Sequence, residues 1–351
     1  MIPYFLFLLF LLIFYCGNKP ICMLIVMIAF AVLRYDTGWD YGMYEHIVNT
    51  PSFWDNADTS RFSLVWRGLF ALSNKLNAPH LAIAVANVLT YVVLYISLCV
   101  LKLTKTQKLH ALLVYCLWND FYLSSFSTIR QALSMTIGLL VFAFIQRKKL
   151  LMSLLSCLIA VHVHTSAVIL ILLYPIYFLR RQLNFKWLCI SVILIGVVLA
   201  CIESVLTSLT DVGLNKYEIY LKWQDNFGGK LIYLNVMLAI YFMLVFYRNK
   251  HISEMEKQCY FMVLSGIFGG IAIYIYGGSI VFARMLSYFT IFMIFILFSS
   301  INIFKERVKI RFLLNCVLVI FFITYLGIIS KGGGNTLSPY VPYKCILLKN
   351  S

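Results

Sequence analysis

The sequence predicts an all-α, polytopic integral membrane protein of about twelve transmembrane helices. Of its 351 residues, 62% are hydrophobic and only 12% are charged, and the mean hydropathy is +0.90. A soluble domain carries about 25% charged residues. Apolar runs long enough to cross a bilayer, roughly 17–25 residues, recur along the whole chain. We therefore expect a single transmembrane domain over residues 1–351.

The distribution of lysine and arginine predicts the orientation in the membrane. Six clusters between apolar runs hold 17 of the 29 basic residues and three of the 13 acidic ones. Cytoplasmic loops are enriched in Lys and Arg, so these clusters mark the cytoplasmic side, and the net charge of +16 does not imply nucleic-acid binding. The clusters are Lys19; Lys102, Lys105 and Lys108; Arg147, Lys148 and Lys149; Arg180, Arg181 and Lys186; Arg248, Lys250 and Lys257; and Lys305, Arg307, Lys309 and Arg311.

The elements follow by alternation between the two sides of the membrane. Helices over 2–16 and 20–33 precede an outer loop, 34–80, in which residues 62–76 form an amphipathic helix at the outward-facing membrane interface. The apolar side chains behind that prediction are Phe62, Val65, Trp66, Leu69, Leu72 and Leu76. Further helices are expected at 81–101, 109–123 and 130–146, in a hairpin over 150–179 that turns at 162–165, and at 187–208, 231–247, 258–276, 282–301 and 312–329.

Charged residues at the outward ends of these helices form the candidate site. Arg130 and Arg284 each open a predicted helix, and an arginine beside a helix N-terminus is an anion-binding arrangement. Several such arginines would suit a diphosphate. A single arginine at this depth can also be an interfacial anchor, an alternative that stays open above all for Arg34, Arg61 and Arg67.

Three residues are candidates for a general base. His164 is one, because the unperturbed pKa of an imidazole lies near neutral pH, although a turn histidine bonded to local backbone is an equally simple interpretation. Asp36 and Asp40 are four residues apart and could share a helical face, where one would accept a proton from a sugar hydroxyl. Alternatively, the carboxylates are solvated in a loop and pair with Arg34. Tyr44, with Tyr41 and Trp39, is a candidate for stacking on sugar rings.

Cofactor chemistry has no signature in the sequence. The ten cysteines show no CxxC spacing, and no nucleotide-binding glycine pattern, metal-binding HExxH or nucleophile elbow is present. We expect no cofactor and no metal, so that energy comes from a pre-activated substrate or a gradient.

Four segments, in order, resemble the EpsG family of Wzy-like polymerases of bacterial surface polysaccharides. The segments are Arg34 with Gly38-Trp39-Asp40-Tyr41 and Tyr44; Ile129-Arg130-Gln131-Ala132-Leu133-Ser134; His164-Thr165-Ser166-Ala167; and Arg284 with Tyr288-Phe289. The tail through Lys344 is also similar. The chain departs from the family's pattern in two places, since Ser60 or Arg61 stands where a glutamate is frequent and Ser134 where the family has alanine.

The resemblance implies a metal-independent glycosyltransferase, with a GT-C-like architecture, at the outer face of the bacterial plasma membrane. It would transfer a glycan from undecaprenyl diphosphate to the sugar end of another lipid-linked repeat unit of O-antigen, capsule or exopolysaccharide, and a chain-length regulator is a conceivable partner. Arg130 and Arg284 would act on the diphosphate, and Asp36, Asp40 or His164 would be the base. Substrate binding would fall to Arg34, Arg67, Gln131, Tyr44, Tyr288 and Lys344.

Two other functions stay open at this point. A membrane acyltransferase that modifies surface polysaccharide also places histidine and arginine near a membrane face. A transporter or flippase for lipid-linked sugar would favour internal repeats and charges at the bilayer midplane. The ordered series of motifs favours the polymerase.

Overall fold

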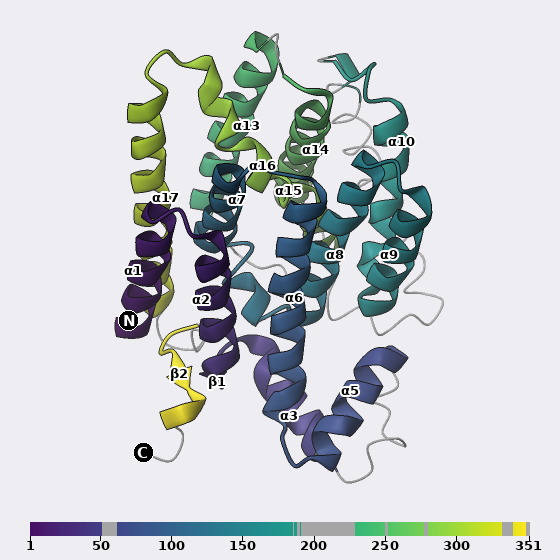
Figure 1. Cartoon of the computed structure of the whole chain (residues 1–351), viewed down its shortest axis with the longest axis vertical. Helices are drawn as coiled ribbons and strands as arrows, with labels where there is room; N and C mark the ends of the chain where they lie inside the picture. Colours follow the sequence, from purple (N-terminus) through teal and green to yellow (C-terminus); the bar gives the residue numbers. More distant parts are fainter. Residues whose placement is uncertain are drawn as a thin grey trace. The chain divides into compact units, whose positions relative to one another are not determined.

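The computed structural model describes residues 1–50, 62–184, 186, 187, 190, 229–249, 252–276, 280–331 and 340–348, and nearly every element in it is a helix (Figure 1). The chain divides into two compact units, Met1–Val168 with Val308–Ser351 (unit 1) and Ile169–Arg307 (unit 2). The predicted helix 187–208 and loop 209–230 fall almost entirely outside the described residues. A single transmembrane domain stays a prediction, since two compact units can belong to one membrane domain.

The long apolar runs of unit 1 form helices close to their predicted positions. Helix α6 packs on α2 and α8, and α8 packs on α9, so α6 and α8 lie at the centre of the unit. These helices are α1 (Ile2–Cys16), α2 (Pro20–Leu33), α6 (His80–Val100), α8 (Ile129–Gln146) and α9 (Leu150–Val163), and α17 (Arg307–Lys331) is longer than predicted.

The chain is a membrane-embedded, all-α protein. Within the described part, three helical segments are long and apolar enough to cross a bilayer, namely His80–Val100, Ile129–Gln146 and Arg307–Ile328. Several shorter apolar helices accompany them, including α1, α2 and α9. The count of twelve spans stays a prediction.

Helix α7 (Lys105–Leu117) differs at both ends from the predicted helix 109–123. It begins earlier because Thr104 caps it: the backbone N–H of Gln107 donates to Thr104 Oγ1 (3.3 Å), and Gln107 Oε1 accepts from Thr104 N (2.9 Å). It ends earlier because Trp118 is extended and is followed by turn-favouring Asn119 and Asp120. A short 3₁₀ helix, η1 (Ser124–Phe126), occupies the predicted outer turn.

The predicted outer loop 34–80 contains two helices that contact each other and α6. Helix α3 (Trp39–Asn49) was not predicted, and α5 (Leu64–Lys75) confirms the amphipathic helix. The apolar side chains behind that prediction divide between a side packed against protein and an exposed side. The side packed against protein carries Trp66, Phe70 and Ser73, whereas the outward side carries Leu64, Val65, Leu72 and, just past the helix end, Leu76.

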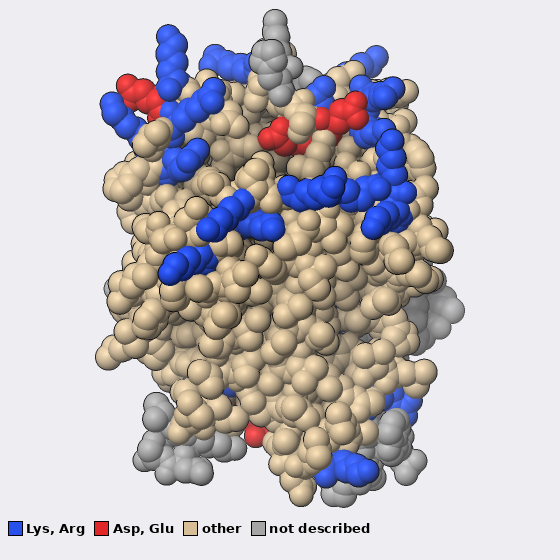
Figure 2. Space-filling view, viewed as in Figure 1, with Lys and Arg blue, Asp and Glu red and all other residues tan. Residues whose placement is uncertain are grey.

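Charge separates the two ends of unit 1. The basic clusters lie at the α1–α2, α6–α7 and α8–α9 turns, which share one end of the unit. In the view of Figure 2, which includes both units, most Lys and Arg side chains lie in the upper half, above a nearly uncharged flank. The opposite end carries α3, α5 and the starts of α6 and α8 (Figure 1). The alternation predicted from charge is therefore confirmed for unit 1.

Unit 2 contains the second half of the predicted 150–179 hairpin and the late helices. The hairpin turns at His164 as predicted, but it continues as a 3₁₀ helix, η2 (Thr165–Leu172), which crosses the boundary between the units. Helix α14 packs on α13 and α15. The helices after the hairpin turn are α10 (Leu173–Phe178), α13 (Gly229–Arg248), α14 (Glu254–Tyr276), α15 (Ile280–Thr290) and α16 (Met293–Ile296), followed by the 3₁₀ helix η3 (Ser299–Ile303).

The predicted single helix 282–301 is wrong, because the chain breaks it into α15, α16 and η3. The hydroxyl of Ser299 donates to the Ile296 carbonyl (3.1 Å), and that of Ser300 donates to the Leu297 carbonyl (2.7 Å). Serine hydroxyls that bond back to carbonyls one turn earlier compete with the helical ladder. Paired serines at the end of an apolar run thus favour the tighter turn that follows.

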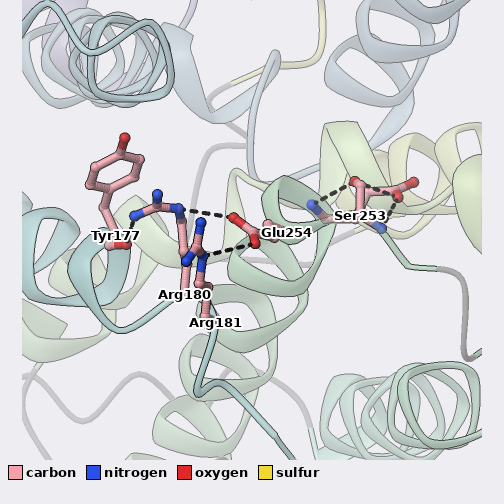
Figure 3. A network of polar contacts seen from close by, with 6 residues as sticks. Tyr177, Arg180, Arg181, Ser253 and Glu254 are labelled. Carbon is pink, nitrogen blue, oxygen red and sulfur yellow. Dashed lines mark hydrogen bonds and ion pairs between the residues drawn. The ribbon is translucent and has the colours of Figure 1, made fainter.

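A polar network ties α10 to α14 at the basic end of unit 2 (Figure 3). Arg180 Nε donates to Glu254 (3.0 Å), Arg180 Nη1 donates to the Tyr177 carbonyl (2.9 Å), and Arg181 Nε lies 3.6 Å from Glu254. Ser253 caps α14, since its Oγ accepts from the backbone N–H of the third helical residue at 3.3 Å. Exposed ion pairs contribute about 0–1 kcal/mol, so this network positions two helix ends rather than forming a binding site.

Candidate functional site

The C-terminal tail lies against the polar stretch that follows α2. Strand β1 (Arg34–Tyr35) pairs antiparallel with β2 (Lys344–Cys345), which sets Arg34 opposite Cys345 and Tyr35 opposite Lys344. The Tyr343 hydroxyl donates to the Phe30 carbonyl (2.6 Å), and the Tyr4 hydroxyl donates to the Tyr340 carbonyl. We call residues 340–345 the C-terminal strap.

Asp36 forms an ion pair with Lys344 of the strap, and both side chains are about half exposed. Asp36 has a left-handed backbone (φ 42°) and precedes α3, whereas Asp40 lies in the first turn of that helix. The expectation that the two aspartates share a helical face is therefore wrong. The helix cannot start earlier because the chain must first turn sharply at Gly38.

Gly38 makes that turn possible. Its φ is +96°, and a Cβ at this position would lie 2.0 Å from the Phe126 carbonyl oxygen, so only glycine fits. The next residue, Trp39, donates its backbone N–H to Ser127 Oγ (3.1 Å). The start of α3 is thereby fixed against the segment that leads into α8.

Asp40 and Arg130 meet at the N-terminus of α8. Asp40 Oδ2 accepts a hydrogen bond from the backbone N–H of Ile129 (3.1 Å), the first residue of the helix. A carboxylate is stabilised there by the helix dipole. Arg130 is the second residue, as predicted, and its guanidinium carbon lies 4.3 Å from the centroid of the Phe62 ring, a cation–π contact that orients it.

Tyr44 lies beside this pair and is completely buried. Burial raises the pKa of its hydroxyl well above the usual value; the nearby Asp40 raises it further, and the nearby Arg130 lowers it. The ring packs against Phe62 and Phe70, among other aromatic rings. Stacking of the Tyr44 ring on a sugar is therefore excluded in this arrangement.

The other two aromatic candidates differ from each other. Tyr41 is buried, and its hydroxyl lies 3.1 Å from His80 Nδ1, while His80 Nε2 lies 2.6 Å from the Val32 carbonyl. Since a carbonyl only accepts, His80 carries its proton on Nε2, and Tyr41 donates to Nδ1. Trp39 is 61% exposed and retains an open ring face.

His164 ends α9 at the same end of unit 1. Its backbone N–H donates to the Ala160 carbonyl (2.9 Å), and the Trp66 indole of α5 donates to the Val163 carbonyl (3.1 Å). This contact brings α5, with Arg67, to the His164 turn. Gln131 is buried on α8, where its Nε2 lies 3.9 Å from Met135 Sδ.

Arg34 is fully buried, which rules out an interfacial anchor. Its guanidinium carbon lies 4.2 Å from the centroid of the Phe126 ring, and none of its three nitrogens has a hydrogen-bond partner among the described residues. Burial lowers the pKa of this guanidinium, while the nearby hydroxyls of Tyr91 and Tyr122 raise it. A buried charge without hydrogen bonds is costly.

Arg284 and Tyr288 belong to unit 2 and lie one turn apart on α15. Arg284 is the fifth residue of this helix, so the expectation that it opens a helix is wrong; Tyr288 is buried. Arg61 lies outside the described residues. The remaining candidates of unit 1, with Lys344, gather at one end of that unit (Figure 1).

Sequence reasoning missed the aromatic partners of the arginines. Phe62 contacts the guanidinium of Arg130, and Phe126 contacts that of Arg34. Because aromatic residues make up 16% of the sequence, neither phenylalanine stood out from the others. The one signal in the sequence was the position of Phe126, which lies three residues before the helix that carries Arg130 and therefore close to the candidate site. Neither phenylalanine could be separated from a membrane-facing aromatic residue by pattern alone.

The fold and the site define a class: a membrane-embedded, all-α protein that gathers arginines, aspartates and a histidine at one end of its helices. The model of the EpsG family matches residues 18–345. The chain belongs to the EpsG family, the family of Wzy-like polymerases. No curated protein and no solved structure matches it.

Proposed function

We propose that the protein is a polysaccharide polymerase. It transfers a glycan from undecaprenyl diphosphate to the sugar end of another lipid-linked repeat unit, at the outward face of the bacterial plasma membrane. The observation that carries this proposal is the arginine at the N-terminus of α8, oriented by Phe62 and adjacent to the Asp40 cap. Because the family makes polysaccharide, a diphosphate-linked lipid is the anion that such an arginine would meet.

The donor side of the reaction needs cations. The bond between the anomeric carbon and the phosphate oxygen breaks, and negative charge grows on the leaving diphosphate. Arg130 and the N-terminus of α8 stabilise that charge, which is where preorganised donors lower the barrier most. Arg284, the second arginine that the sequence assigns to the diphosphate, stays a prediction.

The acceptor side needs a base. The acceptor hydroxyl oxygen bonds to the anomeric carbon, and its proton passes to His164, since an unperturbed imidazole has a pKa of about 6.5. Asp40 already accepts the Ile129 N–H at a helix N-terminus, so we assign it the task of positioning Arg130. Asp36 is paired with Lys344. Substrate contacts are expected from Arg67, Gln131 and Lys344.

The test is polymerisation in vitro with purified full-length protein and a defined lipid-diphosphate oligosaccharide, without added nucleotide or metal. Products longer than the single repeat unit are expected. A protein that leaves the substrate unextended would refute the proposal. In cells, loss of the gene should leave single repeat units on the acceptor lipid, whereas complete absence of translocated units would indicate a flippase.

A further inference from the structure

Arg34 is a buried charge that the proposed reaction does not use. The side chain has five N–H donors and is completely enclosed, yet its closest favourable contact is a ring face, that of Phe126. An apolar side chain of similar length would contact Phe126 without the cost of burying a charge. Asp40 is near enough to favour the charged form electrostatically but forms no hydrogen bond with Arg34, so the unused donors are better explained by a ligand than by packing.

The strap closes over this arginine. Cys345 faces Arg34 across the β1–β2 pair, and the Tyr343 ring, 4.2 Å from the Phe30 ring between centroids, stacks on the last turn of α2. Its other links to the rest of unit 1 are an edge contact between the Tyr343 and Tyr4 rings, single hydrogen bonds, and the half-exposed pair between Asp36 and Lys344. A two-residue strand and an exposed ion pair contribute little stability, so the strap can detach from β1 while the helices stay packed.

An apolar crevice lies next to the strap. It runs between α1 and α17 as a narrow groove that holds no water-sized cavity. Tyr4 belongs to its wall and also donates its hydroxyl to the strap carbonyl of Tyr340, so the crevice and the strap share a residue. The crevice is also lined by Phe5 and Leu8 of α1 and by Phe322, Ile323 and Leu326 of α17.

We propose that Arg34 is the cation of a second, closed anion site, which takes the phosphate group of a membrane lipid once the C-terminal strap leaves β1. The lipid chain would lie along the crevice between α1 and α17. The proposal rests on the proposed function in one respect, since the polyprenyl diphosphate carrier is the lipid of this chemistry that the enzyme would meet. The anion site itself is inferred from the burial of Arg34 and from the pairing of the strap with β1.

The native Cys345 reports on the strap. In full-length protein in lipid nanodiscs, the rate of Cys345 modification by a maleimide is followed by mass spectrometry of the C-terminal peptide. Three conditions are compared: no addition, pyrophosphate in solution, and undecaprenyl diphosphate in the bilayer. Undecaprenyl diphosphate should accelerate the modification several-fold, while the exposed Cys16 and Cys99 at the other end of unit 1 keep their rates.

Arg34→Met is the matched variant, because methionine keeps the contact with Phe126 and removes the charge. It should abolish the acceleration. A response of Arg34→Met equal to that of the wild type, or no response of the wild type to either anion, would overturn the site. An equal response to pyrophosphate alone would keep the anion site and overturn its assignment to a lipid.

A second variant covers the case in which Arg34→Met does not fold. Tyr343→Phe removes the hydrogen bond to the Phe30 carbonyl and keeps the ring. It should raise the rate of Cys345 modification without ligand, and an unchanged rate would overturn the moving strap. Polymer is not measured in these experiments, so a protein that labels as expected but fails to polymerise would refute the proposed function alone.

Discussion

Asp40 accepts a hydrogen bond from the backbone N–H of Ile129 at 3.1 Å, across 89 positions of the chain. This contact sets where α8 starts relative to α3, and so where Arg130 is held. The cause is local: the turn at Gly38 allows α3 to begin at Trp39, and the first turn of α3 presents Asp40 to α8.

The first prediction separates a positioning role of Asp40 from a role as base. Asp40→Asn keeps an oxygen that can accept the Ile129 N–H, whereas Asp40→Ala removes it. We expect Asp40→Ala to lose about 1 kcal/mol of stability, as for a helix cap, and at least about tenfold in polymerisation rate. Asp40→Asn should retain most of both, measured by thermal unfolding and in vitro polymerisation. Equal loss of activity in the two variants, with Asp40→Asn fully stable, would make Asp40 the base.

The second prediction concerns His164 and pH. A general base must be unprotonated, so the polymerisation rate should rise with pH through the titration of the imidazole and then level off. His164→Gln should lower the rate by about 10²–10⁴-fold and remove this dependence. The measurement is the initial rate against pH for both proteins at saturating substrate. A rising limb that persists in His164→Gln would assign the base elsewhere.

The third prediction tests Arg130 as the diphosphate residue. Arg130→Lys keeps the charge but loses the planar contact with Phe62 and bidentate binding, so we expect activity to fall at least about tenfold, and further in Arg130→Ala. Phe62→Leu should cost about 0.5–1 kcal/mol in transition-state binding. Lys105→Ala, an exposed change at the opposite end of unit 1, is the control. Long polymer in Arg130→Ala would contradict the assignment.

The fourth prediction tests which side of the membrane the candidate site faces. Gly42 is exposed on α3, and an added Cβ would meet no atom within 4 Å. Gly42→Cys should therefore react with an impermeant maleimide in spheroplasts, while the exposed native Cys16 and Cys99 react only after lysis. The reverse pattern would place the site on the cytoplasmic side.

Apolar runs and charge clusters predicted the long apolar helices of unit 1 and the end at which its candidate residues gather. They could not predict the contact between the strap and β1, because the hydrogen bond from Tyr343 to Phe30 joins residues 313 positions apart. Helix α3 was missed although its buried Tyr41, Tyr44, Ile47 and Val48 recur at helical spacing. In a chain where aromatic and apolar residues are common everywhere, a short periodic stretch among polar residues is easily taken for a loop.

The fifth prediction uses two glycines in the same segment. Gly38→Ala forces a side chain into the Phe126 carbonyl at a positive φ, so the start of α3 must shift and Asp40 must leave the N-terminus of α8. We expect it to cost at least about 2 kcal/mol and to abolish polymerisation. Gly42→Ala, four residues on and in open space within the helix, should instead stabilise by about 0.5–1 kcal/mol. Thermal unfolding in nanodiscs measures both, and equal behaviour of the two variants would show that the turn at Gly38 does not hold Asp40 in place.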